Sequence, residues 1–289
     1  MKVGFIGLGA MGRPMALHLL EAGHELSVYA RRAEAAQPLV DAGATRRATP
    51  AEVAAASEVV FTMVTTGADV EAVALGEGGI LHGARAGTVL VDMGTIPPDT
   101  ARRIAAKLAE RGIEAIDAPV SGGEVGARNA TLAIMAGGKA EVLARVRPLL
   151  EKLGKTLVHV GPSGAGQVAK ACNQMIMVSC IEAVAEAMLL AQRSGADPEK
   201  VRLALSGGSA GSRVLEVFGA KMTARDFKAG VEARLHHKDF GILLNEAVSL
   251  GAPLPVAAQV WQQLNALMAQ GRGREDTSVL LKVLERESQ

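Results

Sequence analysis

The sequence has few aromatic residues and no excess of charge of either sign. Aromatic residues make up 2% of its 289 positions, too few for the stacking platforms with which proteins bind single-stranded nucleic acid. Lysine and arginine number 31 against 30 acidic residues, a net charge of +1, so no basic field attracts nucleic acid or an anionic membrane. Neither is therefore an expected partner.

The two cysteines do not predict a disulfide. Cys172 and Cys180 stand eight positions apart in one helical pattern, a separation of about 12 Å along a helix axis, which exceeds disulfide reach. We expect buried free thiols, as in proteins of a reducing cytoplasm. The histidines and cysteines form no H-x-E, H-E-x-x-H or C-x-x-C grouping, so no metal site is predicted.

No segment of the sequence predicts a signal peptide or a membrane span. The apolar start, residues 3–11, is interrupted by glycines and followed by Arg13, which favours a strand and a turn. The most apolar later stretch, residues 175–191, contains Glu182 and Glu186, which are costly at the centre of a bilayer. We expect a buried helix there, in a globular cytoplasmic protein.

The first half of the chain alternates short β-branched runs with helical ones rich in alanine and leucine, a pattern typical of an α/β fold with a mainly parallel sheet. Helices are expected over residues 11–22, 98–111 and 140–153, each followed by a glycine that stops it: Gly23, Gly112 and Gly154. Strands are expected over residues 2–6, 25–30, 58–64, 88–93, 113–118, 132–136 and 156–160.

Strand signals cease after the Gly-Pro-Ser-Gly stretch at residues 161–164, and only helical patterns follow. We therefore predict a doubly wound Rossmann domain over residues 1–162 and an all-helical substrate and oligomerisation domain over residues 163–289. The first helix beyond the boundary is expected over residues 165–194, with Gly195 as its stop, and would be about 45 Å long at 1.5 Å per residue.

A glycine motif lies between the first expected strand and the first expected helix. In this context, the first glycine of G-x-G-x-x-G permits a tight turn, the second lets the backbone approach a pyrophosphate, and the third lets helix and strand pack closely. A purely structural turn is the alternative. The residues predicted to bind the dinucleotide here are Gly7, Leu8, Gly9, Ala10, Met11 and Gly12.

The end of the second expected strand bears on which dinucleotide is bound. A site that prefers NAD carries a carboxylate there, which binds the 2′-hydroxyl of the ribose. This sequence has Arg31 and Arg32 instead, and guanidinium groups match phosphate geometry. We predict a preference for NADP over NAD, with Arg31 as the stronger candidate. Two solvated arginines in a loop are the alternative.

The helix expected at residue 165 begins with a polar stripe. Spacings of three and four residues place Gln167, Lys170, Asn173 and Gln174 along one face. From spacing alone, the favoured interpretation of Lys170 is a surface lysine whose ammonium reaches water, because polar groups that enter a buried helix are costly unless they are paired. A role in a site is the alternative.

Four segments together resemble the β-hydroxyacid dehydrogenase family: residues 7–12, residues 117–123 (Asp-Ala-Pro-Val-Ser-Gly-Gly), residues 166–174, and Lys238-Asp239. Their order and spacing cover essentially the whole chain. The resemblance implies a fold like that of 6-phosphogluconate dehydrogenase and NAD(P)-dependent interconversion of a small β-hydroxy acid and its semialdehyde. It also implies a homodimer or homotetramer that acts on a small carboxylate substrate.

The resemblance further implies the roles of individual residues. Lys170 matches the catalytic lysine, a general acid in reduction and a base in oxidation, and Asn173 contacts the substrate. A nearby Lys238 and partial desolvation would lower the pKa of Lys170 toward neutrality. Substrate binding is implied for Ser121, Gly122, Gly123 and Lys238, and cofactor binding for Thr95, Lys238, Asp239 and the loop residues Met63 and Val64, where the family usually has Leu-Pro.

Residues 212–217 and 235–239 are most similar to the branch of the family that reduces tartronate semialdehyde. Reduction of succinic semialdehyde or glyoxylate and oxidation of 3-hydroxyisobutyrate are alternatives within the family. A dinucleotide-binding scaffold without turnover is an alternative from another class, because folds do not fix function. A related imine reductase would carry aspartate or tyrosine at position 170, which is lysine here.

Overall fold

A computed structural model describes residues 1–287, and the chain divides into two compact units, Met1–Lys170 and Ala171–Gln289. Unit 1 contains a nine-stranded sheet in the order β3-β2-β1-β4-β5-β6-β8-β7, with β9 paired to β8. Its first six strands are parallel to one another. The strands are β1 (Lys2–Ile6), β2 (Glu25–Tyr29), β3 (Thr45–Arg46), β4 (Val59–Thr62), β5 (Val89–Asp92), β6 (Glu114–Asp117), β7 (Val120–Ser121), β8 (Leu132–Gly137) and β9 (Gly154–Gly161).

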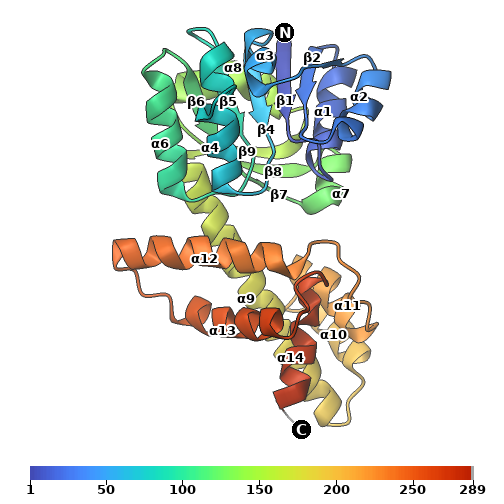
Figure 1. Ribbon diagram of the computed structural model, residues 1–289. Coiled ribbons are helices and arrows are strands. Elements are labelled where there is room, and N and C mark those ends of the chain that lie inside the picture. The colour runs from blue at the N-terminus through green and yellow to red at the C-terminus, as the bar shows by residue number, and fades with distance from the viewer. Residues whose placement is uncertain (288–289) are drawn as a thin grey trace. The chain divides into compact units, whose positions relative to one another are not determined.

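Helices cover both faces of this sheet (Figure 1), so the central strands are buried on both sides. Side chains alternate between two apolar cores: Phe61 belongs to one and Val60 to the other. The first core includes residues of α1 (Gly12–Glu21), α2 (Gln37–Asp41), α7 (Gly123–Arg128) and α8 (Ala140–Leu150). The second includes residues of α3 (Pro50–Ala55), α4 (Gly67–Leu75), α5 (Ile80–Gly83) and α6 (Pro98–Ala109).

The strand order reverses around β1, which pairs with β2 on one side and with β4 on the other. Ligands of doubly wound proteins bind outside the carboxyl ends of the strands at such a switch point. Gly7 follows β1 directly, and Met63 follows β4. The glycine motif predicted from the sequence therefore lies where this fold binds ligands.

The expected α/β architecture is confirmed, and all seven predicted strands are present. The two-residue strands β3 and β7 were not predicted, because two residues carry no periodicity. Gly23 and Gly112 follow their helices with φ of 85° and 69°, as expected for stops. The prediction for Gly154 is wrong: it opens β9, where a Cβ atom would lie 2.2 Å from the carbonyl oxygen of Leu132.

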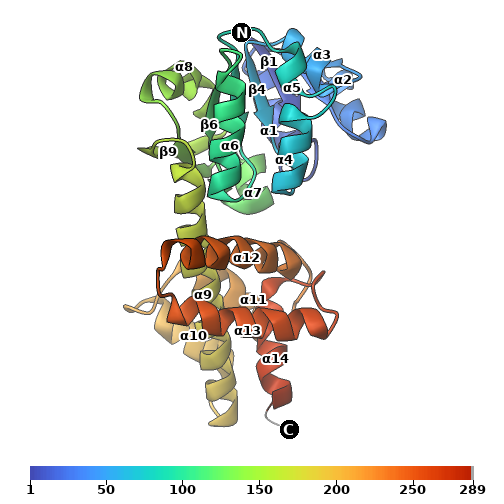
Figure 2. The same ribbon diagram turned by 60° about the vertical axis from the view of Figure 1, so that its left-hand side comes forward.

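The second unit is helical over its described residues, apart from an isolated bridge between Glu232 and Asp276. The helix α9 (Ala165–Arg193) begins in unit 1, and its later turns contribute to the core of unit 2. The helices α12 (Ala233–Leu250) and α13 (Pro255–Ala269) lie side by side (Figure 2). The other elements are α10 (Pro198–Ser206), a π-helical turn (Leu215–Gly219), α11 (Ala220–Thr223), a 3-10 turn (Thr277–Val279) and α14 (Leu280–Glu287).

The helix α9 is long and apolar enough to cross a membrane by length and composition, a test that core helices also pass. Val178, Ile181 and Ala185 of α9 are fully buried in the core of unit 2, which agrees with the predicted buried helix. Both cysteines are free thiols, as expected. Their predicted burial is wrong, because Cys172 is exposed and Cys180 is only partly buried.

The division between the units falls at Lys170, eight residues beyond the predicted boundary at residue 162. The strands end at Gly161, as the sequence indicates. The start of α9 belongs to unit 1 because Gln167 is hydrogen-bonded to Asp117, Gly94 and Ile96 of that unit.

Two glycines of the same loop give opposite predictions for stability. A Cβ atom on Gly12 would lie 1.9 Å from the carbonyl oxygen of Gly7, whereas a Cβ atom on Gly9 would meet no atom within 4 Å. We expect Gly12→Ala to lower the free energy of unfolding by about 1–3 kcal/mol or more, and Gly9→Ala by less than about 0.5 kcal/mol. Urea denaturation measures both, and equal losses would contradict the packing described here.

Candidate active site

The glycine loop leaves the start of α1 open to an anion. Gly7 has φ of 98°, and a Cβ atom there would lie 2.3 Å from the carbonyl oxygen of Met63. Gly9 and Ala10 are exposed. The N-cap of α1, Met11, makes no side-chain capping hydrogen bond. Backbone N–H groups at the start of a helix attract phosphate through direct hydrogen bonds and the helix dipole, so this loop fits a dinucleotide pyrophosphate.

Two further loops lie against the glycine loop. The approach of Gly7 to Met63 places the loop of Met63 and Val64 beside it, and a Cβ atom on Gly94 would lie 3.0 Å from the carbonyl oxygen of Val64. Thr95 follows Gly94 in the loop between β5 and α6. Of the residues predicted to bind the cofactor, Leu8 is 5% exposed and belongs to the apolar core, so its backbone rather than its side chain faces the loop surface.

Arg31 lies just beyond the end of β2 with its side chain 83% exposed. Its Nη1 lies 3.5 Å from Oδ1 of Asp69. Asp69 also forms a capping box with Thr66 at the start of α4, so the ion pair directs Arg31 toward that helix end. Arg32 is exposed next to it. Both guanidinium groups are accessible to a phosphate.

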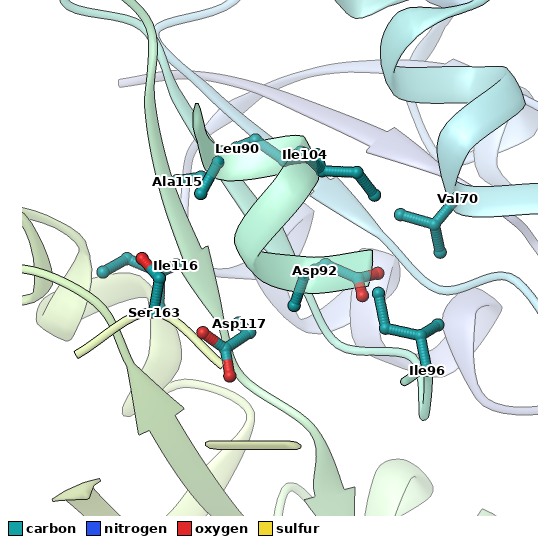
Figure 3. A pocket seen from close by; sticks show the side chains of 11 residues that line it. Val70, Leu90, Asp92, Ile96, Ile104, Ala115, Ile116, Asp117 and Ser163 are labelled. Carbon is teal, nitrogen blue, oxygen red and sulfur yellow. The ribbon is translucent and has the colours of Figure 1, made fainter. Parts of the chain in front are cut away.

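Three buried polar residues end neighbouring strands in one register: Thr62 on β4, Asp92 on β5 and Asp117 on β6. Thr62 Oγ1 donates a 2.7 Å hydrogen bond to Asp92 Oδ1, which also accepts from the backbone N–H of Gly94 at 3.3 Å. Asp92 and Asp117 line a pocket of about 20 Å³ together with Ile96 and Ser163 (Figure 3). A volume of this size admits about one water molecule and no substrate.

The Asp117 carboxylate binds the first turn of α9. Its Oδ1 accepts from the backbone N–H of Gly164 at 2.7 Å, and its Oδ2 from the backbone N–H of Gln167 at 3.0 Å. Burial raises the pKa of the Asp117 carboxyl, and the backbone N–H groups of Gly164, Gln167 and Gly166 oppose that shift only in part. The start of α9 is therefore fixed to the end of β6.

Gln167 joins the same turn to the loop between β5 and α6. It is 1% exposed. Its Oε1 accepts from the backbone N–H of Ile96 at 3.1 Å, and its Nε2 donates to the carbonyl oxygen of Gly94 at 2.9 Å. Thr95 is the residue between those two contacts.

Lys170 is 7% exposed and lies three residues beyond Gln167 on α9. This burial excludes the interpretation of a surface lysine that spacing alone favoured. Burial of an ammonium is costly unless the group is paired and hydrogen-bonded, and a buried lysine can serve as a general base.

The loop predicted to bind a substrate carboxylate begins where β7 ends. Ser121 closes β7, Gly122 precedes α7 with φ of 134°, and Gly123 opens α7 with φ of 60°. Both glycines adopt a backbone conformation that side chains disfavour. The loop therefore presents backbone groups and one hydroxyl without bulky side chains.

In unit 2, four polar residues form a chain of contacts. Asn173 Nδ2 donates to Gln174 Oε1 at 2.8 Å, and Gln174 Nε2 donates to Asp239 Oδ2 at 2.6 Å. Lys238 Nζ lies 3.1 Å from Asp239 Oδ1. Gln174 and Asp239 are 3% and 7% exposed, so the contacts join Asn173 to Lys238 through a largely buried pair.

Sequence reasoning gave no role to Asp92, Asp117, Gln167 or Gln174. A signal existed for Asp117, which opens the motif at residues 117–123, and for the two glutamines, which belong to the polar stripe of α9. No spacing rule could show their partners, which are 47 to 73 residues away for Asp117 and Gln167 and 65 residues away for Gln174. Among residues 1–287, no group of three or more His, Cys, Asp or Glu side chains could hold a metal ion.

Two known domain families together match nearly the whole chain. Residues 2–161 match the NAD binding domain of 6-phosphogluconate dehydrogenase. Residues 164–284 match the NAD-binding domain of NADP-dependent 3-hydroxyisobutyrate dehydrogenase. The chain is 45% identical over 285 residues to 2-hydroxy-3-oxopropionate reductase of Escherichia coli (strain K12), a match that covers 99% of this chain and 97% of that protein.

Two solved structures are similar over nearly the whole chain. Mycobacterium tuberculosis 3-hydroxyisobutyrate dehydrogenase with L-serine is 32% identical, with a TM-score of 0.90 over 98% of both chains. Psf3, solved with NADP+ and 2-OPP, is 25% identical, with a TM-score of 0.88 over 98% of this chain and 99% of that one.

The fold and the comparisons together define a dehydrogenase that uses a nicotinamide dinucleotide. The chain belongs to the β-hydroxyacid dehydrogenase family, together with the 3-hydroxyisobutyrate dehydrogenases. The resemblance stated from four short segments is thereby confirmed.

The raised pKa of Asp117 predicts how stability depends on pH. The folded protein holds this proton more tightly than the unfolded chain, so the stabilisation from Asp117 is complete below the unfolded pKa and is lost as pH rises through the folded pKa. Because asparagine does not titrate, we expect the stability deficit of Asp117→Asn relative to the wild type to shrink as pH rises above the ordinary aspartate pKa of about 3.9.

Urea denaturation of both proteins over a series of pH values above that pKa measures the deficit. The core variant Leu150→Ala removes no titratable group, so its deficit should be independent of pH. A deficit of Asp117→Asn that stays constant or grows with pH would contradict the assignment.

Proposed function

We propose that this chain reduces a short semialdehyde to its β-hydroxy acid and catalyses the reverse oxidation, with Lys170 as the general acid and base. The observation that carries the proposal is the burial of Lys170, which lies one turn beyond Gln167 on α9. Gln167 is itself hydrogen-bonded to Gly94 and Ile96, on either side of Thr95. A general acid must lie within hydrogen-bond reach of the atom that it protonates, and the attachment of the Lys170 turn to the cofactor domain supports such a placement.

The chain's residues supply the proton and the orientation of the substrate. The reduced nicotinamide dinucleotide, when bound by this domain, would supply the hydride for the aldehyde carbon. The Lys170 ammonium donates its proton to the carbonyl oxygen, which becomes the hydroxyl of the product, and the resulting amine takes a proton from solvent. In oxidation, the amine form of Lys170 accepts the hydroxyl proton.

The proposed substrate is tartronate semialdehyde, which is 2-hydroxy-3-oxopropionate, the compound named for the relative at 45% identity. Ser121, Gly122 and Gly123 are proposed to bind its carboxylate, because small residues and exposed backbone N–H groups suit an anion. Asn173 and Lys238 are proposed to contact the substrate as well, with Lys238 also reaching the cofactor. Their chain of contacts through Gln174 and Asp239 supports this role.

Other short substrates of the family are the second candidate. The relative solved with L-serine binds a compound that carries a hydroxyl on the β-carbon, as 3-hydroxyisobutyrate does. Succinic semialdehyde and glyoxylate complete the set to be assayed. A scaffold without turnover is disfavoured, because the similar proteins are named as a reductase and a dehydrogenase.

We further propose that NADP is preferred over NAD, with Arg31 and Arg32 binding the 2′-phosphate and with residues 7–12, Met63, Val64, Thr95 and Asp239 contributing to the cofactor site. The exposed guanidinium of Arg31 supports this preference, as does the relative solved with NADP+. We propose a cytoplasmic enzyme with residues 1–162 as its cofactor domain and residues 163–289 as its substrate and oligomerisation domain.

A homodimer or homotetramer is proposed because unit 2 exposes large apolar side chains. Ile176, Leu190, Val248, Leu250 and Val256 are each more than 60% exposed. Exposed apolar side chains of this size, where they form a patch, mark interaction surfaces.

The role of Lys170 predicts the kinetics of Lys170→Ala. We expect kcat to fall by about 10²–10⁴, while the Kd for the reduced cofactor, measured by its fluorescence, changes by less than about twofold. Lys139→Ala, which removes an exposed lysine paired with Glu114, should keep wild-type kcat. General acid–base catalysis contributes about 10²–10⁴ to the rate. If Lys170→Ala keeps more than about a few per cent of wild-type kcat, Lys170 is therefore not the general acid and base.

The cofactor preference predicts Michaelis constants. The wild type should use NADPH with a lower KM than NADH, and Arg31→Ala should raise the KM for NADPH by about tenfold, which corresponds to about 1.4 kcal/mol, with little change for NADH. Arg111→Ala, an exposed arginine on another loop, serves as the control. A lower wild-type KM for NADH would overturn the preference.

A further inference from the structure

Gln167 is a buried amide to which the proposed chemistry assigns no role. Its side chain is 1% exposed and uses both of its polar groups within unit 1. The oxygen faces a backbone N–H, and the nitrogen faces a carbonyl oxygen, so the two contacts fix the orientation of the amide. No other uncharged side chain of this length carries a donor and an acceptor at the same end.

The two backbone groups that Gln167 binds flank Thr95. Nε2 donates to the carbonyl oxygen of Gly94, and Oε1 accepts from the backbone N–H of Ile96. Asp92 also binds this loop, because its Oδ1 accepts from the backbone N–H of Gly94 at 3.3 Å. Asp92 and Ile96 lie close to each other at this edge of the sheet (Figure 3). The path of the loop at Thr95 is therefore set partly by a side chain of α9.

The turn of α9 that carries Gln167 also carries Lys170. Residues three apart lie on one face of a helix, about 4.5 Å apart along its axis. The Asp117 carboxylate fixes the start of this turn through the N–H groups of Gly164 and Gln167. Because this turn carries Lys170, any movement of the turn relative to the Thr95 loop would also move the Lys170 ammonium relative to that loop.

We propose that Gln167 is a positioning residue that sets the distance between the Lys170 ammonium and the reacting carbon of the bound nicotinamide. It does so by joining the Lys170 turn to the Thr95 loop. The inference rests on the proposed function, in which Lys170 exchanges the proton and the Thr95 loop contacts the nicotinamide. Gln167 itself touches neither substrate nor cofactor in this account.

The test uses two variants with the full-length protein. Gln167→Met keeps the length and volume of the side chain but removes both hydrogen bonds, and Gln167→Asn keeps the amide but is too short to reach both backbone groups. We expect kcat to fall by about 10-fold to 100-fold in each variant, because a displacement of about 1 Å can cost 10²-fold. The KM for the cofactor should change far less than kcat, since only the Thr95 contact with the nicotinamide is altered, while the glycine loop and Arg31 are untouched.

The deuterium isotope effect is the readout that separates positioning from stability. With reduced cofactor deuterated at the transferred position, the isotope effect on kcat should rise in both variants, because misplacement slows proton and hydride transfer relative to product release. Leu143→Ala, a core variant in α8, is the control: it should lower the unfolding temperature and leave the isotope effect unchanged.

Each outcome bears on one proposal. If Lys170→Ala is inactive while folded Gln167→Met and Gln167→Asn keep wild-type kcat and isotope effect, the positioning role is overturned and the proposed function stands. If the wild type reduces no semialdehyde tested, the proposed function fails. The fluorescence emission of bound NADPH then tests the positioning role of Gln167 without turnover. An emission spectrum altered in the Gln167 variants but not in Leu143→Ala supports the positioning role, and an unaltered one overturns it.

Discussion

The hydrogen bonds between the Asp117 carboxylate and the start of α9 determine where this helix begins. The first N–H groups of a helix have no partner within it, and a carboxylate placed there binds them and also complements the helix dipole. Asp117 lies at the end of β6 and binds Gly164 and Gln167. The position of the first turns of α9, which include Lys170, is therefore set by their attachment to the parallel sheet.

The sheet brings the cofactor loops to the same edge. The reversal of strand order at β1 places the glycine loop beside the loop of Met63 and Val64, and Gly94 packs against Val64. Gln167 then joins the Thr95 loop to α9. In the proposed site, the backbone groups of these short loops bind the dinucleotide, and the buried Lys170 lies on a helix that is tied to the Thr95 loop, an arrangement that suits hydride transfer with proton exchange.

Local patterns in the sequence predicted the elements that repeat a pattern over many residues, such as β1, α6 and the long helix α9. They did not predict β3 and β7, which are two residues each. The glycine motif was found because its chemistry is local. Burial of Lys170 was not predicted by spacing, which favoured the surface, because burial depends on how segments far apart in the sequence pack together. The hydrogen bond between Gln174 and Asp239 was not predicted either, because these residues are 65 positions apart in the sequence.

The central claim is that a buried lysine exchanges a proton with a substrate held beside the nicotinamide. A crystal structure with oxidised cofactor and a bound β-hydroxy acid tests it most directly. We predict the Lys170 nitrogen within about 2.6–3.2 Å of the oxygen that gains or loses the proton, on the side of the nicotinamide carbon that accepts the hydride. A complex in which another group occupies that position and Lys170 lies out of hydrogen-bonding reach would contradict the account.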